Sequence, residues 1–132
     1  MNNISNIKNE RSSQNLTKKK IKKKALEMRN QGCLYDLPNE GLDDYFNGSV
    51  DRFCDIAEKV RNKKRVLDVG CGQGVLLLIL NELGHECHGV DIAEASDNLG
   101  ERFTQKNIKF QVGNIEVDSL PYTDGFFDAV VC

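Results

Sequence analysis

The sequence of 132 residues lacks the long apolar segments that a membrane-spanning helix requires. Such a helix needs about 20 consecutive apolar residues, and no run in the chain approaches that length. The N-terminus has no apolar stretch behind its positive charges, so we expect no secretory signal peptide. With 39% hydrophobic and 29% charged residues, the composition fits an ordinary globular domain. We therefore expect one folded domain and no membrane partner.

Paired cysteine motifs are missing as well. The five cysteines are scattered and form no C-x-x-C pair, so neither a disulfide framework nor a zinc ribbon is indicated. His85, Cys87 and His88 offer metal-ligand atoms, but they crowd into the start of an extended strand, whose side chains alternate between two faces. We expect no metal site. Unpaired cysteines are typical of a reducing compartment, which predicts a cytoplasmic protein.

Charge is distributed unevenly along the chain. The net charge is −2, but residues 1–24 carry +7 and residues 25–132 carry −9. An acidic body disfavours nucleic acid on the folded surface, so a nucleic-acid partner stays open only for the basic tail. Residues 1–16 are too polar to form a core and are predicted to be disordered. The lysine-rich segment 18–24 is either a solvated helix end or a contact for RNA or an anionic surface.

Two helices are expected in residues 17–62. Three apolar residues recur at helical spacing before a stop at Gly32. Residues 33–48 mix aromatics with Pro, Gly and Asp and predict turns around a short helix. Ser49 is placed to cap the next helix, whose apolar stripe should pack against a sheet. The two apolar stripes consist of Ile21, Ala25 and Met28, and of Val50, Phe53, Cys54, Ala57 and Val60.

Residues 63–132 contain short apolar strands that alternate with helices. The expected strands are Val66–Val69, Cys87–Ile92, Ile108–Val112 and Phe126–Cys132, and the expected helices are Val75–Leu83 and 94–106. This alternation implies an α/β fold: a Rossmann-like parallel sheet with right-handed crossovers and helices on both faces. The fourth strand is apolar enough to lie inside a sheet, yet the chain stops within it. We therefore expect a core truncated after the fourth strand, completed by a longer natural domain or by another chain through this exposed strand.

Three alternate glycines separate the first of these strands from its helix. Gly70, Gly72 and Gly74 directly follow the strand, and Asp91 ends the second strand, seventeen residues beyond Gly74. Glycine lets a ligand approach the backbone at the carboxyl end of a strand, and a carboxylate there can accept hydrogen bonds from both ribose hydroxyls. The pattern predicts a nucleoside-containing ligand.

Nicotinamide-dependent oxidoreductases share this pattern. Their G-x-G-x-x-G motif would place a glycine at position 75, where this chain has Val75. A phosphate-binding P-loop is excluded because no Gly-Lys-Ser/Thr occurs. Asp68, at the end of the first strand, suits a positively charged group better than a phosphate. These residues favour a ligand without phosphate over a dinucleotide.

The residues resemble those of class I S-adenosylmethionine (SAM) dependent methyltransferases. V-L-D-V-G-C-G-Q-G at 66–74 is similar to their glycine motif, and G-V-D-I at 89–92 to their second-strand acidic motif. Residues 113–115, 120–122 and 127–132 are similar to their third- and fourth-strand signatures. The resemblance covers about residues 50–132 and is closest in character to the small-molecule branch that includes ubiquinone-biosynthesis-type enzymes.

The resemblance implies SAM as the cofactor and transfer of its methyl group to a small-molecule acceptor. The glycine loop would flank the methionine part with Asp68 nearby, Asp91 would hold the ribose, and Ile92 and Ile115 would lie against the adenine. Asn114 stands where many relatives have an aspartate; its carbonyl oxygen can still accept a bond from the adenine amino group. The implied cofactor-binding residues are Asp68, Gly70, Cys71, Gly72, Gly74, Asp91, Ile92, Asn114 and Ile115.

Several assignments stay open. No catalytic base can be named, and a SAM-binding fragment or pseudoenzyme without turnover remains an alternative. Cys71 is not expected to act as a thiolate, because no His follows it in the motif. Tyr35, Tyr45 and Phe46 would form a lid over the cofactor or belong to the core. Asp128 is expected to be a turn residue before the fourth strand.

Overall fold

The computed structural model describes residues 3–34, 40–95 and 97–132. The eight elements follow the order α1 (Asn3–Asn30), α2 (Glu40–Lys59), β1 (Arg65–Val69), α3 (Val75–Glu82), β2 (Glu86–Asp91), α4 (Asp97–Gln105), β3 (Lys109–Val112) and β4 (Ala129–Val131). The four strands form one parallel sheet in the order β3-β2-β1-β4. The predicted α/β fold with a parallel sheet is confirmed.

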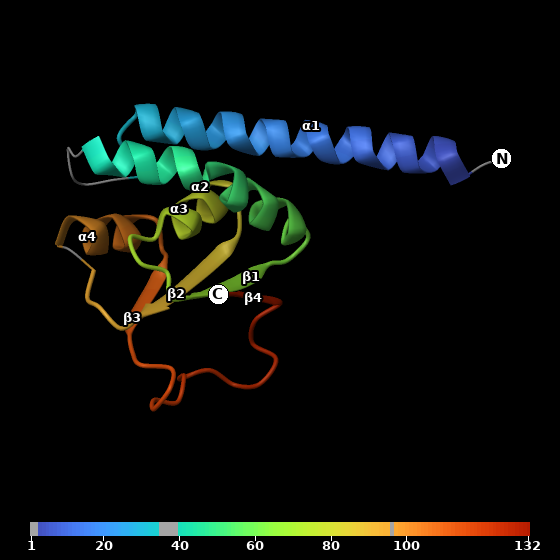
Figure 1. The fold of residues 1–132 in the computed structure, drawn as a ribbon. Helices are drawn as coiled ribbons and strands as arrows, with labels where there is room; N and C mark the ends of the chain where they lie inside the picture. Colours follow the sequence, from blue (N-terminus) through green and yellow to red (C-terminus); the bar gives the residue numbers. More distant parts are fainter. Residues whose placement is uncertain (1–2, 35–39, 96) are drawn as a thin grey trace.

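The helices α2, α3 and α4 lie on one face of the sheet (Figure 1). On β2, Gly89 faces Leu77 of α3, and Phe110, its neighbour on β3, stacks on Phe103 of α4. Two right-handed crossovers that step in the same direction along a sheet place their helices on the same face. The sequence predicted helices on both faces; among the described residues, the opposite face carries the segment 113–128 instead.

That segment is attached to the opposite face by an aromatic cluster around His88. The His88 ring meets the rings of Tyr122, Phe126 and Phe127 edge-on, with centroids 5.1–5.6 Å apart. Its two nitrogens lie 3.1 Å from the Tyr122 hydroxyl and 3.1 Å from a Glu86 carboxylate oxygen. These contacts hold the connection between β3 and β4 against the sheet without a helix.

Helix α1 begins at Asn3, so residues 3–16 have a helical backbone where the composition predicted a disordered tail. Extending an existing helix adds one hydrogen bond per residue and needs no new nucleus, so a polar segment can continue the helix formed by residues 17–30. The predicted stop is confirmed: Gly32 has φ +71° and donates to the Arg29 carbonyl oxygen at 3.0 Å, while the Cys33 N–H donates to that of Met28 at 2.9 Å. These two hydrogen bonds close the C-terminal end of the helix.

Helix α2 is longer than predicted, because it begins at Glu40 and runs through Gly48 and Ser49. Ser49 is therefore an interior residue and not an N-cap. The turns and separate short helix predicted in residues 33–48 are wrong from Glu40 on, where one continuous helix runs to Lys59. Phe46 is fully buried and extends the apolar stripe by one turn before Val50. Burial of this ring outweighs the weak helix propensity of Gly48.

Helix α1 is attached to the rest of the domain by its lysine-rich segment. Ile21, Ala25 and Met28 are buried in the same core cluster as the strand residue Val66. Three lysines flank this stripe and pair with acidic side chains of α2 and α3. The pairs are Lys18–Asp55 at 2.7 Å, Lys22–Asp51 at 3.0 Å and Lys24–Glu82 at 3.1 Å. Half of the six lysines thus serve contacts within the chain.

Asp128 is a structural residue at the start of β4, as predicted. One of its carboxylate oxygens accepts the backbone N–H groups of Lys64 at 3.0 Å and Arg65 at 2.9 Å, while its own N–H donates to the Arg65 carbonyl. The Arg65 and Lys64 N–H bonds hold the pKa of Asp128 below its usual value. The side chain therefore fixes β4 beside β1.

Candidate functional site

The strand order reverses between β1 and β4, because β2 and β3 lie to one side of β1 and β4 to the other. In open α/β sheets, ligands bind at the carboxyl ends of the strands at such a reversal. Two cavities open there and share Val69, Gly70 and Cys132. The sequence-derived site residues converge on this position.

The glycine loop after β1 is anchored to the end of β2. The N–H groups of Gly70 and Cys71 donate to the Val90 carbonyl oxygen at 2.8 and 3.2 Å. The Gly72 N–H donates to a carboxylate oxygen of Asp91 at 2.8 Å. Gly70 and Gly72 have φ of +73° and +54°, a left-handed conformation that other residues adopt at a cost. The loop is thus held against the end of β2, and its first glycine, Gly70, lines both cavities.

Asp91 is the polar centre of the site. Its second carboxylate oxygen accepts the Ala93 N–H at 3.0 Å. The bonds from Ala93 and Gly72 lower the pKa of Asp91, so that its carboxylate is charged at neutral pH. A carboxylate offers about four lone-pair positions, so both oxygens retain capacity for ribose hydroxyls. Asp91 therefore braces the glycine loop and is available to a ligand.

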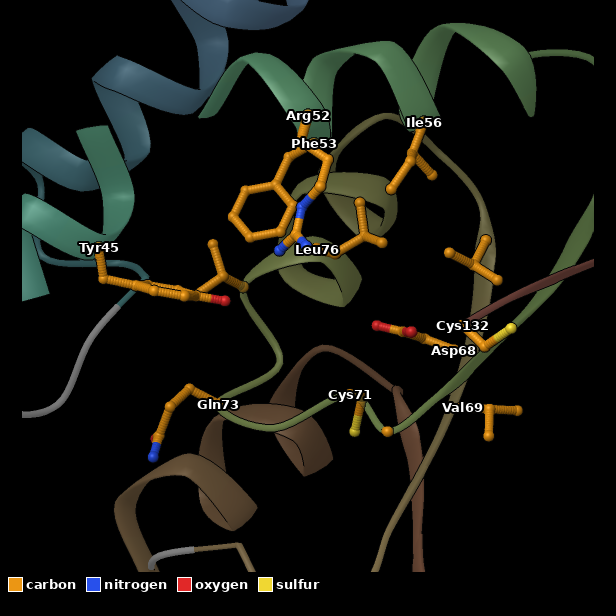
Figure 2. A pocket seen from close by; sticks show the side chains of 13 residues that line it. Tyr45, Arg52, Phe53, Ile56, Asp68, Val69, Cys71, Gln73, Leu76 and Cys132 are labelled. Atoms are coloured by element: carbon orange, nitrogen blue, oxygen red, sulfur yellow. The ribbon is translucent and has the colours of Figure 1, made fainter. Parts of the chain in front are cut away.

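The first cavity, of about 150 Å³, lies between α2 and the glycine loop. Figure 2 shows the Asp68 side chain projecting into it from β1, with Arg52 and Tyr45 reaching in from α2. The Cζ atom of Arg52 lies 5.3 Å from the centroid of the Phe53 ring. The Tyr45 and Phe53 rings meet edge-on, with their centroids 6.3 Å apart. The cavity thus combines a carboxylate, a guanidinium and an aromatic wall.

Asp68 is buried at 7% exposure, and no described residue forms a hydrogen bond or ion pair with its carboxyl. Burial, and then the nearby charge of Asp91, raise the pKa of Asp68 to about 6; the positive charge of Arg52 opposes this shift. A buried acid without a partner is costly, and such groups concentrate at functional sites. Asp68 is therefore suited to receive a cationic group of a ligand.

The second cavity, of about 420 Å³, is open and largely apolar. Ile92 and Ile115 line it with 70% and 55% of their surface exposed. Asn114 also lines it; its side-chain oxygen accepts the Glu116 N–H at 3.0 Å and keeps one lone pair. Two exposed isoleucines beside Asp91 form a surface that suits a planar apolar ring next to a ribose.

The structure brings most of the sequence-derived residues together. The first cavity is lined by Asp68, Gly70 and Cys71, and the second by Gly70, Asp91, Ile92, Asn114 and Ile115. Gly72 lines neither cavity and joins the site through its bond to Asp91. Gly74 also lines neither: a Cβ built there would collide with the Phe103 ring, so this glycine serves packing between α3 and α4.

Apart from Tyr45, the α2 residues that line the first cavity were not among the candidates predicted from the sequence. Arg52, Phe53 and Ile56 line the first cavity, but no local pattern in the sequence places this helix beside the glycine loop. Of the aromatics considered for a lid, Tyr45 lines the cavity at 47% exposure, whereas Phe46 is a fully buried core residue. Tyr35 lies outside the described residues.

The cysteines and histidines near the site are buried or make structural contacts. Burial is the main cause that raises the pKa values of Cys71 and Cys87 to about 12, so neither thiol ionises at neutral pH. His85 lies 2.6 Å from the Lys63 carbonyl oxygen, and His88 belongs to the aromatic cluster on the opposite face. Within residues 3–34, 40–95 and 97–132, no group of three or more His, Cys, Asp or Glu could hold a metal ion.

No helix described in the structure is long and apolar enough to cross a membrane.

The chain is similar in sequence to known methyltransferases. A family model described as a methyltransferase domain matches residues 67–132. The uncharacterised methyltransferase YcgJ of Bacillus subtilis is 37% identical over 76 residues, which cover 54% of this chain and 29% of that protein. The ubiquinone biosynthesis O-methyltransferase of Acinetobacter baylyi is 35% identical over 75 residues, with 52% and 30% covered. The (S)-tetrahydroprotoberberine N-methyltransferase of Eschscholzia californica is 30% identical over 102 residues, with 75% and 29% covered.

A solved structure supports the fold. The PH0226 protein of Pyrococcus horikoshii OT3 superimposes with a TM-score of 0.54 at 23% identity, covering 79% of this chain and 45% of that one. The chain spans about 30% of the length of the curated relatives it matches. The family match covers half of the chain and includes the glycine loop, Asp91 and β4. The chain therefore belongs to the methyltransferase domain family, as its resemblance to class I SAM-dependent methyltransferases implied.

Proposed function

We propose that the protein binds SAM across the two cavities and transfers its methyl group to a small-molecule acceptor. The observation that carries this proposal is the buried carboxyl of Asp68 beside the glycine loop, which forms no hydrogen bond or ion pair with any described residue and lies one strand away from the charged carboxylate of Asp91. SAM combines a ribose with a cationic sulfonium and ammonium, so one ligand satisfies both carboxylates.

In this proposal the nucleoside part of SAM lies in the second cavity and its aminoacyl arm in the first. Asp91 accepts bonds from the ribose hydroxyls, and Ile92 and Ile115 hold the adenine ring in the second cavity. Asp68 faces the positive charge of the aminoacyl arm in the first cavity, and Arg52 on the opposite wall is placed for its carboxylate. This distribution of charge matches a zwitterionic arm.

The loop geometry disfavours a pyrophosphate. The N–H groups of Gly70, Cys71, Gly72 and Gly74 all donate to acceptors within the protein. A phosphate at this position would therefore find these amides occupied and would lie close to Asp68. The same contacts argue against the oxidoreductase alternative.

When bound, SAM would supply an activated methyl group: a nucleophilic atom of the acceptor would form a bond to the methyl carbon as the carbon–sulfur bond breaks, and the electron pair of that bond would stay on sulfur as a neutral thioether. The contribution of the chain's residues is to position the cofactor and to exclude water from the first cavity. Tyr45 and Phe53 form the apolar wall on the α2 side, where an acceptor would approach. The relatives named for O- and N-methyl transfer to small molecules support an acceptor of that class.

We further propose, in line with the five free cysteines, that the protein works in the cytoplasm. A division into a polar tail (1–16), N-terminal helices (17–62) and a SAM-binding core (63–132) stays a proposal. Contact of the basic tail with nucleic acid and self-association through β4 stay predictions.

The activity is tested by release of S-adenosylhomocysteine from SAM in the presence of a panel of small phenols, amines and carboxylates. We expect release with at least one acceptor. Asp91→Asn should lower it at subsaturating SAM, because losing ribose bonds weakens binding by about 1–3 kcal/mol. The exposed Asp124→Asn is the matched control and should behave as the wild type. Saturable SAM binding without release from any acceptor would instead support a non-catalytic SAM-binding protein.

A further inference from the structure

The last glycine of the loop lies against a phenylalanine and not against the ligand cavities. A Cβ built on Gly74 would collide with Cζ of Phe103 and lie 2.7 Å from its Cε1. The three nearest heavy atoms to that position all belong to the Phe103 ring. The ring therefore contacts the backbone of Gly74 so closely that no side chain fits between them.

The Phe103 ring has little freedom to move away. It is 2% exposed and stacks on Phe110 of β3, with centroids 5.7 Å apart and an interplanar angle of 28°. The preceding residue, Arg102, donates to the carbonyl oxygens of Cys33 at 2.9 Å and Gly32 at 3.2 Å. Helix α4 is thus held both by β3 and by the end of α1, and it presents a fixed surface to Gly74.

Gly74 joins the glycine loop to the first turn of α3. It is the N-cap of the helix, with φ +70° and ψ +19°. Its N–H donates to the Cys71 carbonyl at 2.9 Å, and its carbonyl accepts the Leu78 N–H at 2.9 Å. A shift of Gly74 therefore moves the loop on one side and the helix on the other.

We propose that Phe103 is a positioning residue of the cofactor site: its ring supports Gly74 and holds the glycine loop in the conformation that receives the nucleoside ligand. The identity of that ligand rests on the proposed function, whereas the contact itself does not. Phe103 lines neither of the two cavities at the site. Its replacement removes no ligand contact, so a loss of affinity must come through the loop.

The test compares Phe103→Leu with Phe110→Leu, which removes the other ring of the same stacked pair. Hydrogen–deuterium exchange of the peptide 70–76 is measured without ligand, and affinity for S-adenosylhomocysteine is measured by calorimetry. Both variants should lose thermal stability, because each removes one of the two rings of the stacked pair. Phe103→Leu should raise loop exchange and weaken binding by about tenfold or more. Phe110→Leu should stay within about threefold of the wild type, because it keeps the Phe103 ring against Gly74 and the bonds from Arg102 still hold α4 at the end of α1.

A second variant guards against a general packing effect. Phe103→Tyr keeps the stacked ring but adds an oxygen to Cζ, an atom that faces Gly74. It should disturb loop exchange and affinity, unlike Phe110→Tyr. The proposal fails if both Phe103 variants keep wild-type loop exchange, or if the Phe110 variants change the loop equally. A wild-type protein that does not bind S-adenosylhomocysteine would refute the proposed function, while loop exchange would still decide the role of Phe103.

Discussion

The two carboxyl groups of the site, those of Asp68 and Asp91, have opposite pKa shifts. Asp91 is stabilised in its charged form by two backbone N–H groups, which lower its pKa. Asp68 is buried without such a partner, and its pKa is raised to about 6. The ligand-free protein therefore holds one carboxylate ready for hydrogen bonds and one that is stabilised when a positive charge arrives.

The raised pKa of Asp68 predicts a gain in stability when the acid is removed. Between about pH 4 and 6 the folded state keeps a proton that the unfolded state has lost, so stability falls as pH rises through this window and is constant above it. Asp68→Asn should therefore raise the free energy of unfolding at pH 7.5 by about 1–3 kcal/mol. Urea denaturation at pH 7.5 and pH 4.5 measures this.

The pH dependence separates this effect from a simple packing change. The difference between Asp68→Asn and the wild type should shrink towards zero at pH 4.5, where the wild-type carboxyl is protonated. The same variant should bind SAM more weakly at pH 7.5, because the cationic arm loses its counter-charge. A difference in stability that is equal at both pH values would contradict the assigned burial of an unpartnered charge.

The sequence predicted the part of the site that is local in the chain. Asp68, Gly70 and Asp91 lie at the ends of adjacent strands, so strand order alone brings them together. Arg52 could not be assigned, because its place at the cavity depends on how α2 packs on the sheet. Gly74 belongs to the same motif, yet its neighbour Phe103 lies 29 residues away in the chain and is not evident from local spacing.

At the scale of elements, α2 shows how tertiary burial overrides local signals. In the sequence, Gly48 and Ser49 are typical of a turn followed by an N-cap. In the structure, Phe46 is fully buried, and its burial stabilises a helix that already begins at Glu40. The end of α1 at Gly32 was predictable, because a left-handed glycine after an apolar stripe is a local feature.

These two glycines predict opposite effects of the same substitution. Gly48→Ala should raise the free energy of unfolding by about 0.5–1 kcal/mol, because alanine favours the interior of an exposed helix segment. Gly32→Ala should lower it by about 1 kcal/mol or more, because its φ of +71° strains any residue with a Cβ. Thermal or urea unfolding of the pair checks both. If Gly48→Ala destabilised the protein, α2 would not continue through position 48.

At the scale of the whole molecule, the reversal of strand order between β1 and β4 explains why the site lies where it does. The two cavities meet at this point, and α2 covers one of them (Figure 2). The parallel sheet was predictable from alternating strand and helix patterns. The one-sided placement of the helices was not, because it depends on the direction in which each crossover steps.

The opposite face of the sheet is less covered. Val130 on β4 is 60% exposed there, beside an aromatic cluster whose rings are half-buried. The chain matches about 30% of the length of its curated relatives. Cofactor binding is the part of the function that the described residues support directly.

Calorimetric titration of the wild-type protein with SAM, S-adenosylhomocysteine and NAD tests that claim most directly. We predict saturable binding of SAM and S-adenosylhomocysteine at a single site and binding of NAD that is weaker by about tenfold or more, which corresponds to about 1.4 kcal/mol. Failure of both sulfur-containing nucleosides to bind, or tighter binding of NAD, would contradict the assignment of the site to SAM.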